Sequence, residues 1–455
     1  MDKATRKNYL FNNKDLIHLL LPLIIEQFLA MAVGMADSIM VASVGESAVS
    51  AVSLVDSVNI LLINIFAALA TGGAVVAGQY IGQKQNEKAC KAGEQLLVFV
   101  TLISLVIMSI MYFGRGFILH VVFGNIEADV SAYANTYMLI VFASIPFIAI
   151  YNSGAALFRA MGNSKITMLT SIIMNTINVV GNALLIYVFH MGVEGVAIPT
   201  LVSRAVAAII IVALLRKQEL IVHISKPFKY KYDKGMVKNI LQIGIPNGVE
   251  NSMFQLGKIL LLSVVAGFGT ASITANAVGN AVSSFEILPG AAIGLGLVTV
   301  VSQCVGAGDY EQVRYYTKKL LMYAYVSMIV LNVGIILFTP AILDIYNLSE
   351  ETAAMASNVI IFHGINSCLI WPLSFTLPNT LRAANDARFT MIIGVGSMWT
   401  FRIGFGILIA KYMNLGMFGV WVAMIIDWII RSIFFVLRYK GNKWENNYDS
   451  SLNLN

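Results

Sequence analysis

Long apolar stretches separated by short polar segments make up almost the whole chain of 455 residues. A helix needs roughly 20 apolar residues to cross the ~30 Å hydrocarbon core of a membrane. Windows of that kind lie near residues 15–43, 52–81, 94–114, 131–157, 166–189, 194–215, 237–266, 274–305, 319–338, 354–381, 389–410 and 415–437. The pattern therefore predicts an all-α integral membrane protein with twelve transmembrane helices.

Composition agrees with this class, because 58% of the residues are hydrophobic and only 12% are charged, whereas soluble proteins carry about 25% charged residues. The formal net charge of +6 comes from basic residues in short loops, so it predicts membrane topology and no nucleic-acid partner. The three cysteines are scattered and form no CxxC, so neither a disulfide framework nor a metal site is expected.

Basic residues gather before the first window and after the second, fourth, sixth, eighth, tenth and twelfth. The alternate loops are acidic, with Glu127, Asp129, Glu350 and Glu351 among their residues. Because cytoplasmic loops carry an excess of Lys and Arg, both termini are predicted in the cytoplasm and the protein in the inner (plasma) membrane.

The two halves of the chain repeat each other, with local matches such as FRAMGNSKITM against LRAANDARFTM. Matching residues keep a nearly constant spacing along the whole chain. The pairs include Pro22/Pro246, Glu26/Glu250, Gln79/Gln303, Arg159/Arg382 and Thr167/Thr390. Six spans per repeat is an even number, so both halves insert with the same orientation, related by a pseudo-twofold axis along the membrane normal.

This repeat predicts four parts of the chain. Residues 1–216 form an N-lobe, 217–235 a cytoplasmic inter-lobe linker, 236–440 a C-lobe and 441–455 a flexible tail.

The first window contains two acids, Glu26 and Asp37, although an ionisable group inside hydrocarbon costs about 2.5–3.5 kcal/mol. Their separation of eleven residues is about 20° past three full helical turns, so they share a face. Acids along one stripe of a membrane helix indicate a site that binds a coupling cation.

The paired starts with Pro22 and Pro246, the QYIG-type ends of the second and eighth spans, and the RAMGNSK and RAANDAR segments resemble the multidrug and toxic compound extrusion (MATE) family. The resemblance covers about residues 15–437. Bacterial proteins that this chain resembles are cation-coupled exporters of organic cations and other amphiphiles, whose two lobes rock between inward-open and outward-open states.

The resemblance implies roles for several residues of the first and fifth spans. Asp37 matches the family acid that binds a proton or Na⁺, although a purely structural acid is the alternative. Asn178 and Asn182 share a helix face and match positions that shape the cation pocket, or they pack as interhelical amides. Many members carry an acid where Asn182 stands, so the choice between H⁺ and Na⁺ stays open. Pro22 resembles a hinge, with an architectural kink as the alternative.

Other charges inside the spans are interpreted from their positions alone. Glu26 and Glu250 occur in both halves and are expected to be structural or gating acids. Lys258 and Glu286 are not duplicated, and similar depth on adjacent helices predicts a buried ion pair between them. Whether that pair only stabilises the C-lobe or also switches with substrate is open.

The last span also contains two charges. Asp427 and Arg431 lie four residues apart and are predicted to pair within a structural network, with Arg402 and Arg204 as candidate partners.

No phosphate-binding loop, HExxH or nucleophile elbow occurs, so the chain is not expected to be an enzyme or to hold a cofactor. The sequence favours a monomeric secondary antiporter in the bilayer that exports amphiphilic, often cationic compounds in exchange for H⁺ or Na⁺. One alternative is a flippase for a lipid-linked precursor. A channel or a membrane-embedded enzyme is the third class, and neither a continuous polar pore nor a catalytic set is visible.

Overall fold

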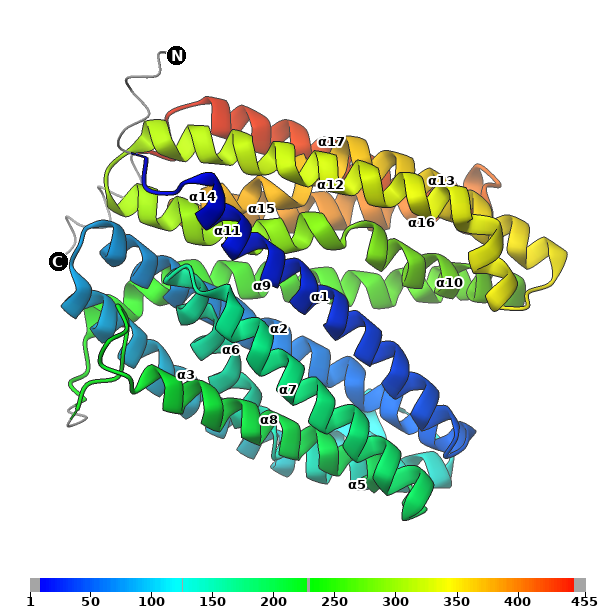
Figure 1. Cartoon of the computed structure of the whole chain (residues 1–455). Helices are drawn as coiled ribbons and strands as arrows, with labels where there is room; N and C mark the ends of the chain where they lie inside the picture. The colour runs from blue at the N-terminus through cyan, green and yellow to red at the C-terminus, as the bar shows by residue number, and fades with distance from the viewer. Residues whose placement is uncertain (1–8, 125, 227–229, 446–455) are drawn as a thin grey trace. The chain divides into compact units, whose positions relative to one another are not determined.

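A computed structural model describes residues 9–124, 126–226 and 230–445 (Figure 1). Within these ranges every regular element is a helix, and eleven helices are long and apolar enough to cross a membrane. A bent pair, Ala128–Phe142 with Ile145–Ala160 at 46°, raises the number to twelve when it is counted as one span. The predicted fold class is therefore confirmed.

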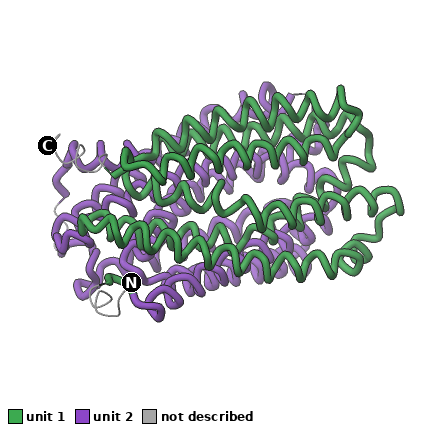
Figure 2. Tube along the Cα trace, turned by 90° about the horizontal axis from the view of Figure 1, so that it is seen from above, with its two compact units in different colours: residues 1–11, 245–455 green, residues 12–244 purple. Residues whose placement is uncertain are grey.

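The chain divides into two compact units, which Figure 2 colours purple and green. The N-terminal unit comprises Asn12–Gly244, and the C-terminal unit comprises Met1–Phe11 together with Ile245–Asn455. The boundary thus falls inside one long helix, and residues 9–11 belong with the second half of the sequence.

In the N-terminal unit, the long second helix (Glu46–Gly82) packs against the third, fifth and sixth helices. The first helix packs against the seventh, and the seventh packs against the eighth. The elements of this unit are α1 (Asn13–Ala42), α2 (Glu46–Gly82), α3 (Asn86–Phe113), α4 (Arg115–Phe117), α5 (Ala128–Phe142), α6 (Ile145–Ala160), α7 (Ser164–Ala183) and α8 (Glu194–Leu215), with π-helical turns η2 (Ile118–Val122) and η3 (Leu184–Val188).

Helix α9 (Lys234–Ala266) begins in this unit and continues into the other. The C-terminal unit then contains α10 (Thr270–Glu286), α11 (Leu288–Gly306), α12 (Tyr310–Ile345), α13 (Glu350–Trp371), α14 (Pro378–Ala383), α15 (Ala387–Ser397), α16 (Phe405–Tyr412) and α17 (Gly416–Lys440), with π-helical segments η4 (Pro372–Thr376) and η5 (Met398–Gly404). Here α11 packs on α12, α10 on α13, and α17 on α13 and α16.

Helix α1 begins with a capping box, in which the Asp15 amide donates to the Asn12 side chain at 2.9 Å and the Asn12 amide donates to Asp15 at 2.8 Å. Pro22, the predicted hinge, lies inside α1, and the helix continues past it to Ala42. The proline removes one backbone donor from the helix at that point.

The segment predicted as a linker is bound to α3 along its described part. Gln95 donates to the Lys231 carbonyl at 2.7 Å, and Lys91 Nζ lies 2.6 Å from Asp233 Oδ2. The backbone amide and the hydroxyl of Ser225 both donate to Glu94, at 2.8 and 2.6 Å. The polar linker is therefore held on the surface of the N-terminal unit.

The prediction of a flexible tail is wrong for residues 441–445. Trp444 is fully buried and stacks on Tyr439, and Glu445 accepts from Arg314 at 2.5 Å. An aromatic side chain and a carboxylate both find partners on α12 and α17, which fixes this short segment. Residues 446–455 of the predicted tail lie outside the described residues.

Candidate functional site

Three of the predicted site residues meet in one place in the N-terminal unit. Asn182 Nδ2 of α7 donates to Asp37 Oδ1 of α1 at 2.8 Å. With its amide oriented toward the carboxylate, Asn178 places its nitrogen 2.9 and 3.0 Å from the two Asp37 oxygens. In the same orientation its oxygen accepts from the Thr200 hydroxyl of α8 at 3.1 Å.

The Asp37 carboxylate is therefore held by neutral amides, and no cation lies within ion-pair distance of it among the described residues. Asp37 is partly buried, whereas Asn182 is fully buried. The Asn182 Oδ1 atom has no hydrogen-bond partner within the described chain. Carboxylate and amide oxygens at such a point are suitable ligands for a hard cation such as Na⁺, and the carboxylate alone can take a proton.

A second polar cluster in the same unit includes residues that sequence reasoning did not select. Tyr137 of α5 donates to Asp56 Oδ1 of α2 at 3.2 Å, and Arg204 of α8 donates to Ser144 at 2.8 Å. Asp56 and Arg204 are close enough to Asp37 to act on it electrostatically. An acid and an arginine inside predicted spans are the signal that could have identified this cluster. Arg204, expected near Asp427, instead belongs here.

Glu26 and Glu250 are both buried and both paired with arginines that the sequence repeat also relates. Arg159 Nη1 lies 3.6 Å from Glu26 Oε1, and Thr167 donates to Glu26 Oε2 at 2.8 Å. In the C-terminal unit, Arg382 Nη2 lies 2.7 Å from Glu250 Oε2. This pairing favours a structural role for both acids.

The prediction that Asp427 pairs with Arg431 is wrong. Arg431 Nη2 lies 2.8 Å from Glu250 Oε1, so the two oxygens of that carboxylate each bind one guanidinium. Asp427 instead accepts a short hydrogen bond from the Ser397 hydroxyl, and it interacts electrostatically with Arg402. Asp427 and Arg431 share a helix face because they lie four residues apart. Each side chain nevertheless binds a residue of another helix, Ser397 for Asp427 and Glu250 for Arg431.

The predicted ion pair between Lys258 and Glu286 is also wrong, because each of the two residues contacts a different side chain. Glu286 is fully buried and makes a short contact with His363 Nδ1 of α13. Asn332 of α12 donates to the Glu286 backbone carbonyl at 3.0 Å. The rings of Trp421 and Trp428 lie edge-on to His363, at 5.6 and 5.2 Å. Equal depth along two helices does not fix their rotation, and Glu286 faces α12 and α13.

Lys258 lies elsewhere on α9, with its ammonium 5.3 Å from the centre of the Phe254 ring. The Arg402 guanidinium of η5 lies 4.9 Å from the same ring. Both cations are thus placed to be attracted to the negative face of one aromatic ring, and Lys258 does not pair with Glu286.

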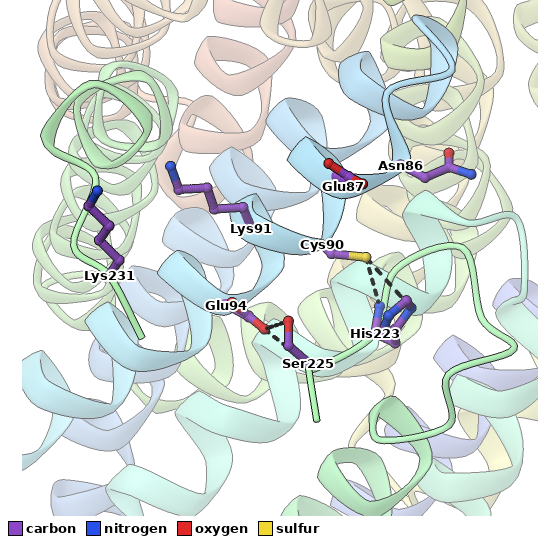
Figure 3. A pocket seen from close by; sticks show the side chains of 8 residues that line it. All are labelled: Asn86, Glu87, Cys90, Lys91, Glu94, His223, Ser225 and Lys231. Carbon is purple, nitrogen blue, oxygen red and sulfur yellow. Dashed lines mark hydrogen bonds between the residues drawn. The ribbon is translucent and has the colours of Figure 1, made fainter. Parts of the chain in front are cut away.

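Figure 3 shows a cavity of about 360 Å³ beside the linker. Cys90 faces His223, with Sγ 3.6 Å from Nδ1, and Glu94 faces Ser225 (Figure 3). Within the described residues no group of three or more His, Cys, Asp or Glu side chains could hold a metal ion. The contacts of this cavity bind the linker to α3.

Two units of membrane-spanning helices, with ionisable side chains placed inside them, define the chain as a multi-pass membrane protein. The MatE family model matches it twice, over residues 22–184 and 246–408. The chain therefore belongs to the MATE family of multidrug and toxic compound efflux transporters, which is a family of transporters and not of enzymes. The two matches begin at the paired prolines, Pro22 and Pro246, which confirms the internal repeat.

Similar proteins match along nearly their whole length. The chain is 25% identical to "Uncharacterized transporter YisQ" of Bacillus subtilis, over 94% of each protein. It is also 25% identical to "Probable multidrug resistance protein NorM" of Thermotoga maritima, covering 95% of this chain and 93% of that protein.

Solved structures share the fold. A crystal structure of a MATE protein in the bent conformation has a TM-score of 0.87 at 19% identity, over 96% of this chain and 97% of that one. An outward-facing multidrug resistance transporter of the family has a TM-score of 0.83 at 20% identity, over 97% of each chain.

Proposed function

We propose that this protein is a secondary active antiporter of the plasma membrane that exports amphiphilic, often cationic compounds in exchange for H⁺ or Na⁺. It acts as a monomer. Both termini lie in the cytoplasm, because the loops on that side carry the basic residues. The name of the Thermotoga relative, "Probable multidrug resistance protein NorM", supports drugs as the substrate class. The family match favours this function over a flippase.

One observation supports the coupling role most directly. Asp37 lies in a spanning helix, and its carboxylate accepts hydrogen bonds from the side-chain amides of Asn182 and Asn178. The carboxylates of Glu26 and Glu250 are instead paired with arginines. The counterpart of Asp37 in the second repeat, aligned by the paired prolines, is Leu261. An acid that the repeat does not duplicate, and that makes no ion pair with an arginine among the described residues, is suited to bind and release a cation.

The mechanism follows from competition between cation and substrate. Occupying the Asp37 site with H⁺ or Na⁺ favours one arrangement of the two units, and bound substrate favours the other. A ligand shifts such an equilibrium only by its differential affinity for the two states. Pro22, fifteen residues before Asp37 in the same helix, is the proposed hinge.

The buried Glu286–His363 pair is a second group that can exchange a proton, because both side chains are titratable and they share a short contact. Its Glu286 Oε1 atom has no hydrogen-bond partner among the described residues. This pair supports proton coupling, whereas the oxygen-rich Asp37 site accommodates either ion.

Efflux into everted membrane vesicles with an imposed proton or sodium gradient tests the proposal. Asp37→Asn removes the charge and keeps the size, and we expect it to reduce gradient-driven efflux by at least about tenfold while expression stays unchanged. Asp344→Asn, an exposed acid outside the site, is the matched control. Efflux that proceeds equally well in Asp37→Asn would exclude this residue from coupling, and Glu286→Gln then tests the second pair.

A further inference from the structure

The C-terminal unit contains a groove of about 600 Å³ between the first half of α12, η4 and the last turns of α17. Most of its lining is apolar and includes Leu321, Met322, Val326, Leu373 and Val436. Met322 and Val326 are more than half exposed. The groove is therefore an open apolar surface on helices that span the membrane.

One end of this groove is basic. Arg314 and Lys318 lie near the start of α12, and Lys440 is the last residue of α17. Arg314 is fixed by Glu445 at 2.5 Å and lies over the rings of Tyr439 and Trp444. Lys318 and Lys440 are exposed. Among the described residues, these three cations and the Glu445 carboxylate give this end two more positive than negative charges.

We propose that this groove binds one anionic phospholipid, with an acyl chain along the apolar lining and the phosphate at Lys318, Lys440 and Arg314. The cations lie at the ends of spanning helices, where lipid headgroups lie, and the apolar lining continues from there toward the hydrocarbon. A soluble anion would use only the basic end, and a zwitterionic lipid would bring no net negative charge to it. The inference needs the membrane location of the family and does not depend on which ion drives transport.

The experiment uses the full chain purified in detergent and incubated with equal amounts of phosphatidylglycerol and phosphatidylcholine, followed by native mass spectrometry. We expect one retained phosphatidylglycerol and little phosphatidylcholine. Each lysine near a membrane surface changes anionic-lipid affinity about fivefold, so Lys318→Ala with Lys440→Ala should weaken retention about 25-fold. Lys165→Ala with Lys238→Ala removes two exposed lysines outside the groove and should change nothing.

Met322→Trp fills the groove without changing its charge, and it should reduce phosphatidylglycerol retention as well. Retention that survives this substitution would mean adsorption to a basic surface and would overturn the proposal. Equal retention of both lipids, displacement by millimolar inorganic phosphate, or a dimer that excludes lipid would each overturn it too. Thermal unfolding of every variant separates loss of lipid from loss of fold.

Discussion

Gly394 of α15 shows how a single residue makes room for a buried charge. A Cβ atom at this position would lie 2.5 Å from Glu250 Oε1 and 2.8 Å from its Cδ. Glu250 cannot swing aside cheaply, because Arg382 and Arg431 hold its two oxygens. The glycine is therefore part of the packing around this ion cluster.

Gly394→Ala should consequently destabilise the protein by about 1–3 kcal/mol, the usual cost of overpacking a filled site. The measurement is the melting temperature of the purified full chain in detergent. Gly396→Ala is a close control, since two residues further along the same chain an added Cβ meets nothing within 4 Å. Equal melting temperatures for the two variants would contradict the packing argument.

At the same scale, the sequence predicted the Asp37, Asn178 and Asn182 cluster, and the structure brings these residues together. It misplaced Lys258 and Glu286, because hydropathy fixes how deep a residue lies but not the direction in which its helix turns it. His363 was missed, although a histidine inside an apolar span is itself a signal of function or pairing.

The linker shows what can be predicted for whole elements. Span positions followed from hydropathy to within several residues, but a polar segment gives no sign of whether it packs. Asp233 joins two elements: Lys91 of α3 donates to its Oδ2 at 2.6 Å, and the Met236 amide of α9 donates to its Oδ1 at 3.0 Å. The hydrogen bond from Lys91 is the main cause that lowers the pKa of Asp233 below its ordinary value, and the Met236 amide adds to it.

A lowered pKa in the folded state means that this contact stabilises the protein fully above the ordinary value of 3.8 and is lost as the pH falls below it. Both side chains are partly exposed, so the contribution should not exceed about 1 kcal/mol. Wild type should therefore melt slightly above Asp233→Asn at pH 7, and the difference should shrink as the pH falls below 3.8. Glu219→Gln, an exposed acid of the same linker, should show no such convergence. A constant difference at all pH values would contradict this assignment.

For the whole molecule, the repeat predicted from the sequence reappears in the ion pairs. Glu26 with Arg159 and Glu250 with Arg382 are equivalent pairs of the two repeats, and each holds a buried carboxylate inside its unit. The two sites have nevertheless diverged. Glu26 takes a threonine hydroxyl as its second donor, whereas Glu250 takes a second arginine, Arg431. The repeat did not indicate this second arginine, because the position that corresponds to Arg431 in the first half is Ala207.

This divergence predicts unequal costs for the same substitution in the two halves. Glu250→Gln leaves two guanidiniums without a counter-charge, and the Arg431 side chain is only 2% exposed, so the loss should approach the roughly 3–5 kcal/mol typical of a broken buried pair. Glu26→Gln leaves one guanidinium, at the longer distance of 3.6 Å and more exposed, and should cost clearly less. Adding Arg431→Met to Glu250→Gln should restore part of the melting temperature, because it removes the buried charge that lost its partner. If Glu26→Gln proved equally costly, or if the double variant were no more stable than Glu250→Gln, the second arginine would not be the cause of the difference.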